Sequence, residues 1–312
     1  MLTKALWVVR DRITTRAAIE DLLAHSVGWN IRDLVVQVRG RGDAYYTSDL
    51  EPRAEALTDP ALDPLAHLIR GGAAVGVRIH AWANGTFVWS SADRALPRSR
   101  DHLVHAHPEW LLRPDGVRYL DPAGGSDWEG IYIDPTIAAA RSHTVSVFED
   151  IVRRYAVEGF HHDYIRYPQV GYAASPDDHA SITALVRETA RRVRAARPGI
   201  VISAAVFPDP TVAREHVLQR WPEWAAERLV DRICPMAYRT DTAEVHRLLG
   251  AARAAAPTTP MWGGLMAYAG ERARARDQVR AAREAGCEGV ILFAYDPQLR
   301  DVIDAFAAEA DR

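Results

Sequence analysis

Residues 33–40 read DLVVQVRG, a short apolar run rich in β-branched residues. Seven further runs of this kind occur along the chain, and a single helical pattern separates most neighbours. They are ALWVVR (5–10), GVRIHAWAN (76–84), GFHHDYIRY (159–167), VISAAVF (201–207), RICPMAY (232–238), MWGGLMA (261–267) and GVILFAY (289–295). Apolar runs that alternate with helices are typical of parallel strands covered on both faces. Eight such units predict an α/β chain with one (β/α)8 barrel over residues 1–312.

A doubly wound open sheet is the alternative, because it also alternates strand and helix. We favour the barrel on the number of runs and because no Gly-x-Gly-x-x-Gly turn follows the first run. The spacing is even except for residues 85–136, which hold Pro, Gly, Trp and His but little helical periodicity. Long loops of this kind are usually functional. We therefore expect an insertion after the third strand that forms part of a substrate groove.

The composition excludes several classes of protein. The 312 residues carry 38 Lys+Arg against 41 Asp+Glu, a net charge of -3, with no basic run that would bind nucleic acid or an anionic membrane. No apolar stretch approaches the ~20 residues of a membrane helix. Two cysteines exclude a disulfide framework, a zinc ribbon and a four-thiolate cluster. No cofactor is implied, and no signal peptide is readable at the N-terminus, so the default expectation is a cytoplasmic protein, or an exported one if the N-terminus was trimmed.

Polar residues interrupt three consecutive runs whose two faces should both be apolar. They are Gln37 and Arg39 in the second run, His80 and Asn84 with Trp82 in the third, and His161, His162, Asp163 and Arg166 in the fourth. Alternation by two puts Gln37 with Arg39, His80 with Asn84, and His161 with Asp163 on common faces, and leaves His162 facing the helices. Buried charges must meet each other or a ligand. Barrel enzymes keep their active sites at these strand ends, so we expect a site here. A purely structural network with an Arg39–Asp163 ion pair is the alternative.

Three stretches resemble a known family. They are QVRGRGDAYYTSDLEP (37–52), LDPLAHLIRGGAAVGVRIHAWAN (62–84) and GFHHDYIRYP (159–168), with weaker matches at HPEW (107–110), Asp134-Pro135 and ICPMAY (233–238). They resemble the bacterial glycosyl-hydrolase-like family 10, barrel proteins related to glycoside hydrolases. The resemblance implies cleavage of O-glycosidic bonds in an oligo- or polysaccharide, with some members cutting bacterial cell-wall glycan strands.

The same resemblance implies roles for individual residues. Asp163 would be the leading catalytic carboxylate, and the sugar site would be lined by Arg39, His80, Trp82, Asn84 and His161. Many relatives have two adjacent aspartates in the fourth strand, whereas here Tyr164 follows Asp163. A role that depends on the second carboxylate is therefore in doubt.

Glycoside hydrolysis normally needs two carboxyl groups. We favour Asp209 as the partner of Asp163, because it ends the strand next to the fourth one. Asp209 before Pro210 also fits a helix N-cap, and the two interpretations carry similar weight. Other carboxyl groups near strand ends are Asp11, Asp43, Asp241 and Asp296. Arg39 or Arg166 beside Asp163 would keep that carboxylate ionised.

Aromatic rings are expected to hold the sugar. Flat rings with polar edges suit the apolar faces of sugars, and Trp82 and Trp110 are the best candidates. Tyr238 and Trp262, on the sixth and seventh strands, are further candidates. EGFHHDYIRYP also loosely resembles the strand-4 motif of chitinase-like hydrolases, but Ile165 stands where those enzymes have their acid.

Two other functions remain open. The first is a metal-dependent hydrolase that uses the strand and loop histidines, although the first strand lacks the paired histidines usual in barrel amidohydrolases. The second is a glycan-binding barrel that has lost its acid, which predicts binding without turnover. No Gly-x-Ser-x-Gly elbow is present, and Cys234 and Cys287 are expected to be buried packing residues.

Overall fold

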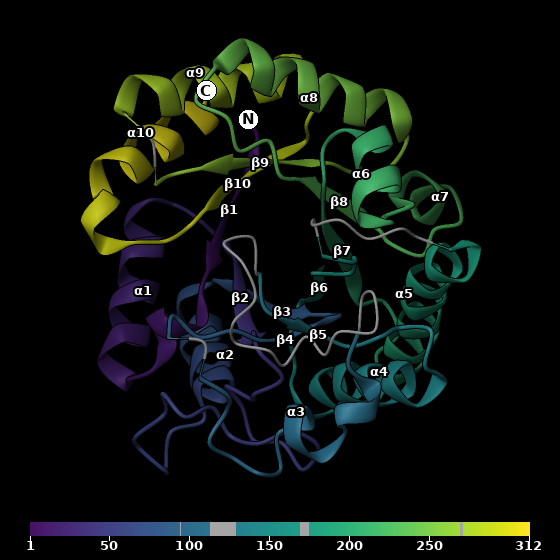
Figure 1. The fold of residues 1–312 in the computed structure, drawn as a ribbon. Coiled ribbons are helices and arrows are strands. Elements are labelled where there is room, and N and C mark those ends of the chain that lie inside the picture. The colour runs from purple at the N-terminus through teal and green to yellow at the C-terminus, as the bar shows by residue number, and fades with distance from the viewer. Residues whose placement is uncertain (94, 113–128, 169–174, 269–270) are drawn as a thin grey trace.

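The predicted barrel is confirmed. The computed structural model describes residues 1–93, 95–112, 129–168, 175–268 and 271–312, and eight parallel strands in it form a nearly closed barrel (Figure 1). The strands are β1 (Thr3–Val8), β2 (Asp33–Arg39), β3 (Arg78–Asn84), β6 (Gly159–Asp163), β7 (Val201–Val206), β8 (Arg232–Pro235), β9 (Trp262–Met266) and β10 (Gly289–Phe293). The ladder runs in the order β8-β7-β6-β3-β2-β1-β10-β9. Isolated bridges from Ile233 to Met261 and from Met236 to Gly264 close the seam between β8 and β9.

Helices surround the strands, as Figure 1 shows. They are α1 (Arg16–Gly28), α2 (Pro64–Val75), α4 (Ala138–Arg154), α5 (Pro176–Ala196), α6 (Pro210–Val217), α7 (Trp221–Ala226), α8 (Thr242–Ala255), α9 (Arg272–Glu284) and α10 (Arg300–Ala310). Local sequence fixes their ends: α2 begins where the Asp63 carboxylate accepts the Ala66 N–H and ends at Gly76, whose φ of 71° is left-handed. The two termini lie side by side, where the Leu2 N–H donates to the Ala310 carbonyl.

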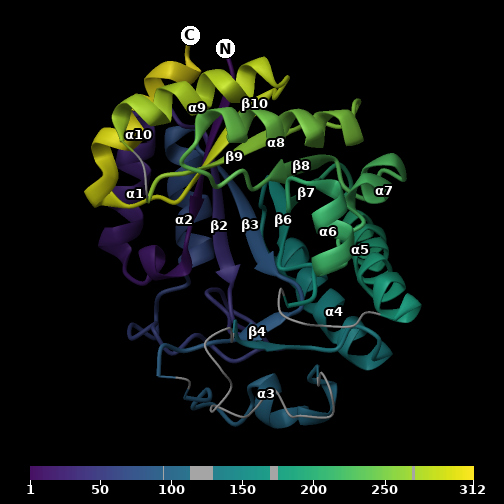
Figure 2. The same ribbon diagram turned by 45° about the horizontal axis from the view of Figure 1, so that its top comes forward.

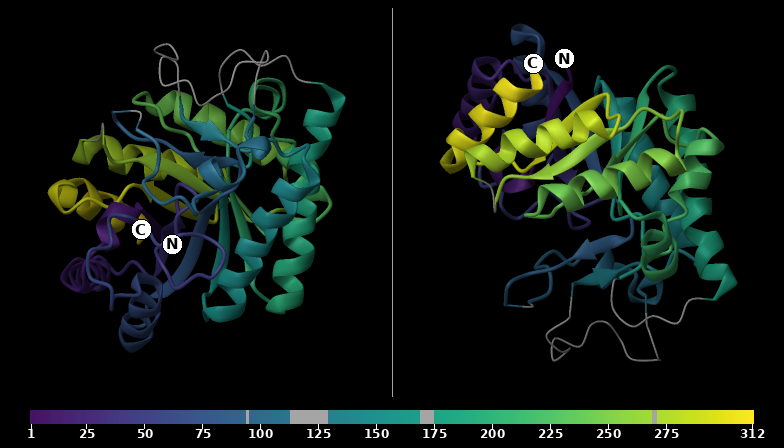
Figure 3. Two further views of the ribbon diagram at one scale, coloured as in Figure 1. Left: turned by 60° about the horizontal axis from the view of Figure 1, so that its bottom comes forward. Right: turned by 90° about the horizontal axis from the view of Figure 1, so that it is seen from above.

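The insertion after β3 contains a small second sheet. Strand β4 (Phe87–Trp89) pairs antiparallel with β5 (Ile131–Tyr132), and α3 (Leu103–Ala106) and the 3-10 helix η2 (Pro108–Trp110) lie between them in sequence. Figure 2 shows β4 and α3 on the side toward which the β2 and β3 arrows point, and the right view of Figure 3 shows this blue segment apart from the yellow C-terminal helices. Residue 94 and residues 113–128 of the predicted insertion lie outside the described residues.

Two apolar clusters stabilise the barrel. The larger one packs the outer faces of the strands against the helices. The smaller one fills the barrel interior with three tryptophans and small residues, namely Ala5, Trp7, Val35, Trp82, Ala205, Cys234, Trp262 and Ile291. Glycines make room for the rings: a Cβ on Gly289 would lie 2.4 Å from the Trp262 ring. Cys234 and Cys287 are both buried and free, which confirms that they are packing residues.

Candidate active site

A cavity of about 610 Å³ opens at the carboxyl ends of the barrel strands. Its walls come from the ends of the barrel strands other than β9, from residues that follow them, and from β4. The lining residues include Trp7, Arg10, Gln37, Trp82, Asn84, Phe87, Ser90, Asp163, Tyr164, Arg166, Phe207, Pro208, Tyr238, Arg239 and Phe293. Its size falls within the usual range for small-ligand sites, and its position is the one barrel enzymes use.

Asp163 ends β6 and faces this cavity, partly exposed. Its Oδ1 accepts the backbone N–H of Tyr164 at 2.7 Å, and Tyr164 has a left-handed φ of 46°. Burial raises the pKa of Asp163 to about 6, against the opposing effects of the Tyr164 N–H and the Arg166 charge. The Arg166 charge favours the ionised carboxylate, as expected, but desolvation outweighs it and the pKa stays above that of an ordinary aspartate.

Trp82, Asn84 and Gln37 form a polar wall beside Asp163. The indole Nε1 of Trp82 donates to Asn84 Oδ1 at 3.1 Å, and Asn84 Nδ2 donates to the Gly40 carbonyl at 2.7 Å. Gln37 Oε1 in turn accepts from Arg10 Nη1 at 2.7 Å. The structure thus brings Trp82 and Asn84 to the cavity together with Asp163, as expected.

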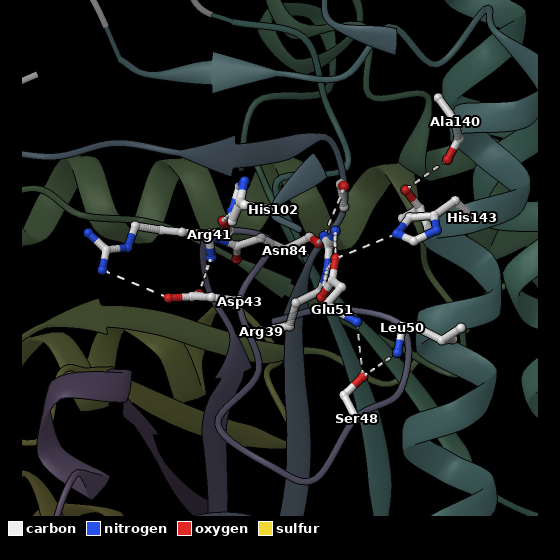
Figure 4. A network of polar contacts seen from close by, with 12 residues as sticks. Arg39, Arg41, Asp43, Ser48, Leu50, Glu51, Asn84, His102, Ala140 and His143 are labelled. Carbon is white, nitrogen blue, oxygen red and sulfur yellow. Dashed lines mark hydrogen bonds and ion pairs between the residues drawn. The ribbon is translucent and has the colours of Figure 1, made fainter. Parts of the chain in front are cut away.

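Arg39 does not line the cavity, which corrects the expectation that it contacts sugar. It is fully buried, and its Nε donates to both carboxylate oxygens of Glu51 at 2.9 Å (Figure 4). The strand register shifts between Gln37 and Arg39, which pair with the adjacent residues Trp82 and Ala83. Such a bulge breaks the alternation by two, so Arg39 no longer shares the face of Gln37.

Arg166 lines the cavity and pairs with Glu129. Its Nη2 lies 2.9 Å from Glu129 Oε1, and its guanidinium carbon lies 4.5 Å from the centre of the Tyr164 ring. Tyr132 also donates to Glu129 Oε2 at 3.2 Å. Glu129, which the sequence analysis did not single out, is thereby held next to a residue of the cavity wall.

His80 and His161 lie deeper in the barrel and do not line the cavity, contrary to expectation. His161 Nε2 accepts the Trp7 indole N–H at 3.0 Å and its Nδ1 contacts Ser203 Oγ at 2.8 Å. Burial lowers its pKa well below the ordinary value, so the ring is neutral. His80 Nε2 lies 2.9 Å from the Asp33 carboxylate, below the layer that reaches the cavity. Barrel interiors are filled in layers, and in this barrel the two histidines are packing elements of lower layers.

Of the remaining aromatic candidates, only Tyr238 lines the cavity. Trp110 stacks on His107 in the insertion, with ring centres 3.7 Å apart. Trp262 lies in the barrel interior under the Arg232 guanidinium, at 3.6 Å. Both are corrections to the expected sugar contacts.

Asp209 caps α6. Its Oδ1 accepts the N–H groups of Thr211 and Val212 at 3.0 and 3.2 Å, and it does not line the cavity, although Phe207 and Pro208 do. The structure therefore favours its capping role. Among the described lining residues, Asp163 is the sole carboxylate.

His162 faces the helix layer, as expected. Its ring centre lies 5.7 Å from that of Phe148 on α4, and neither ring nitrogen has a partner. Within the described part of the chain, no three His, Cys, Asp or Glu residues are grouped so that they could hold a metal ion. The described helices also include none with the length and apolar character needed to cross a membrane.

Comparison with known proteins identifies the family. Residues 2–180, more than half of the chain, match the family model described as Glycosyl hydrolase-like 10. The protein belongs to this family. Glycosyl hydrolase YngK of Bacillus subtilis (strain 168) is 25% identical over 244 residues, which cover 66% of this chain and 45% of YngK. Glycosyl hydrolase DigH of Escherichia coli (strain K12) is 22% identical over 275 residues, which cover 73% of this chain and 59% of DigH. The chain thus spans about half the length of these curated relatives.

Solved structures share the fold. Alpha-L-fucosidase isoenzyme 2 from Paenibacillus thiaminolyticus superposes with a TM-score of 0.70 at 13% identity, over 100% of this chain and 49% of its own. The endo-1,4-beta-mannanase from Rhizomucor miehei gives 0.67 at 10% identity, over 100% and 95%. At such identities the likeness shows that this member of the Glycosyl hydrolase-like 10 family has the same barrel architecture.

The sequence analysis did not single out three charged residues at the site, namely Arg10, Arg239 and Glu129. Arg10 ends the first run and Arg239 directly follows the sixth, so a charged residue near the end of a run, like Asp163 in the fourth, was an available signal for both. Glu129 lies in the long insertion, where no periodicity marks which side chains turn toward the barrel.

Proposed function

We propose that this protein hydrolyses O-glycosidic bonds of an oligo- or polysaccharide, with Asp163 as the general acid. The observation that carries the proposal is a carboxyl group with a pKa raised to about 6 in a cavity at the strand ends. A carboxyl group whose raised pKa lets it keep its proton to a higher pH than an ordinary aspartate can protonate the leaving oxygen of a glycoside. Membership of a glycosyl hydrolase-like family supports the same reaction class.

The cavity wall suits a sugar. Trp82, Tyr164, Tyr238 and Phe293 present rings to the cavity, and Asn84 and Gln37 add amide groups. Rings bind the apolar faces of sugars while amides bind their hydroxyls. Phe87 and Ser90 of the insertion also line the cavity, in line with an insertion that forms part of the groove.

We place the second carboxyl group at Glu129. Its ion-pair partner Arg166 lines the cavity, and the charge of Arg166 also acts on Asp163. Asp209 is the alternative, but its carboxylate already accepts two backbone N–H groups at the start of α6.

The test is turnover on a panel of denuded cell-wall glycan strands, chitin oligomers and plant polysaccharides, with release of reducing ends as the readout. Asp163→Asn is expected to lower kcat by about 10²–10⁴-fold, and wild-type activity should fall as the pH rises through about 6 because the acid loses its proton. Glu129→Gln should lose activity and Asp209→Asn should keep it. Unchanged turnover in Asp163→Asn would refute the assignment.

A glycan-binding barrel without turnover is the second candidate. It is favoured by the single carboxylate among the described lining residues. Glycan binding by the wild type, with no reducing ends released from any substrate of the panel, would establish it in place of the hydrolase.

A further inference from the structure

The charges around the cavity do not balance. Three arginines line it, Arg10, Arg166 and Arg239, against one aspartate among the described lining residues. Arg166 is paired with Glu129. Arg239 is exposed and donates to its neighbour, the Tyr238 carbonyl. Arg10 is therefore the partly buried arginine whose charge at the cavity still needs an explanation.

Arg10 is held in place by neutral groups. Its Nη1 donates to Gln37 Oε1 at 2.7 Å, and Gln37 is itself buried. The side chain crosses Gly40 so closely that a Cβ there would lie 2.7 Å from Arg10 Cδ and 2.8 Å from Nη1. The glycine thus makes room for one particular position of the guanidinium.

Carboxylates near Arg10 are engaged elsewhere. In the part of the chain that the structure describes, none lies within ion-pair distance of its guanidinium. The Arg10 charge favours the ionised form of Asp43. The Asp43 carboxylate is nevertheless bound to Arg41: its Oδ1 accepts the Arg41 backbone N–H at 3.1 Å, and its Oδ2 lies 3.9 Å from Arg41 Nη2. Arg10 Nε and Nη2 have no acceptor among the described residues. This is the edge of a guanidinium that receives a carboxylate through two parallel hydrogen bonds.

We infer that the cavity binds a sugar that carries a carboxylate, and that Arg10 contacts this carboxylate. The inference rests on the glycan-binding cavity of the proposed function and names its substrate class. A uronic acid ring and the lactyl ether of a muramic acid offer the same carboxylate chemistry, and the test separates these two sources.

The test measures binding in the Asp163→Asn background, so that the glycan is not consumed. Two matched pairs of probes are titrated calorimetrically: oligogalacturonate and denuded peptidoglycan strands, each beside its carboxyl-reduced form. We expect the carboxylate form of one pair to bind about tenfold more tightly than its reduced form. The pair that shows the preference identifies the source of the carboxylate.

Variants then assign the preference to Arg10. Adding Arg10→Gln should abolish the preference, by weakening the binding of the carboxylate form more than the binding of the reduced form. Gly40→Ala should also abolish the preference, because the new Cβ displaces the Arg10 side chain although the charge of Arg10 remains. Arg12→Gln is the control: it removes the same charge two residues away, at a side chain that pairs with Asp296 at 2.7 Å outside the cavity lining, and it should keep the preference.

Equal affinity for both forms in both pairs would overturn the inference, as would no binding of any probe. An Arg10→Gln variant that weakens both forms alike would also overturn it. A carboxylate preference in a protein that hydrolyses nothing would refute the hydrolase proposal alone, because binding and turnover are measured separately.

Discussion

Two titratable side chains, adjacent in β6, point to opposite sides of the sheet. Asp163 faces the cavity and His162 faces α4. Burial raises the pKa of the acid to about 6 and lowers that of the histidine to about 3. In both cases the folded protein favours the neutral form, because desolvation penalises charge. Their effects on stability therefore have opposite pH dependence.

Asp163 should cost stability at neutral pH. Its pKa in the folded protein lies above the ordinary 3.8. Its contribution to stability is therefore fully present below pH 3.8 and is lost as the pH rises through about 6. Asp163→Asn removes this titration. We expect the difference in the free energy of unfolding, variant minus wild type, to rise by about 1–3 kcal/mol from pH 4 to pH 7. Urea denaturation at the two pH values measures it. A difference that does not change with pH would contradict the buried acid.

His162 should make the protein sensitive to acid. Its folded pKa of about 3 lies below the ordinary 6.5, so stability is present above pH 6.5 and is lost as the pH falls toward 3. We expect His162→Leu to remove up to about 4–5 kcal/mol of this loss, because the unfolded chain then has no imidazole at this position that takes up a proton. Acid-unfolding midpoints check it, with His246→Leu, on the exposed side of α8, as a control that should not shift.

At the scale of elements, an ion pair connects the loop after β2 to the end of β3. Arg39 and Glu51 are 0% and 1% exposed at their side chains, and Arg39 Nη1 also donates to the carbonyls of Asn84 and Gly85 (Figure 4). Asn84 carries one of the amides of the cavity wall. The pair thus holds the backbone from which a cavity residue projects, without facing the cavity itself.

Breaking this pair on one side should be costly. Glu51→Gln leaves the Arg39 charge buried without a counter-charge, and we expect a loss of about 3–5 kcal/mol in urea denaturation. Replacing both residues by Met should restore much of this loss, since an apolar pair needs no desolvation. The exposed pair Arg187–Glu227 is the control, where Glu227→Gln should cost under about 1 kcal/mol. A double variant as unstable as Glu51→Gln would contradict this account.

At the scale of the whole molecule, the barrel closes at a thin seam. Strands β8 and β9 are joined by two isolated bridges, whereas each of the other neighbouring strand pairs in the ladder is joined through four or more residue pairs. Gly264 lies in this seam, where a Cβ would be 2.7 Å from the Pro235 carbonyl oxygen and 3.0 Å from the Trp7 ring. Trp7, which lines the cavity, and the closure of the barrel thus depend on the same close contact.

Gly264→Ala should strain the seam. We expect a loss of about 1–3 kcal/mol, from overpacking against backbone that cannot move aside, and faster hydrogen exchange in β8 and β9 than in β2 and β3. Gly250→Ala in α8 is the matched control, because nothing lies within 4 Å of its new Cβ, and it should stabilise the protein by about 0.4–1 kcal/mol. Uniform exchange across the barrel in Gly264→Ala would contradict a weak seam.

The sequence by itself determined the eight strands, the place of Asp163 and the outward face of His162. These follow from local rules, since apolar runs mark covered strands and alternation assigns each side chain to a face. The long insertion showed as a break in the spacing.

Only the tertiary structure decided which polar residues meet. A bulge in β2 directs Arg39 toward Glu51, and the layers of the barrel interior place His80 and His161 below the cavity. Asp209 caps a helix, so its carboxylate is already hydrogen-bonded. The pairing of Arg166 with Glu129 and the place of Arg10 across Gly40 join residues distant in sequence. Such contacts depend on register and depth, which the sequence pattern of a single strand does not specify.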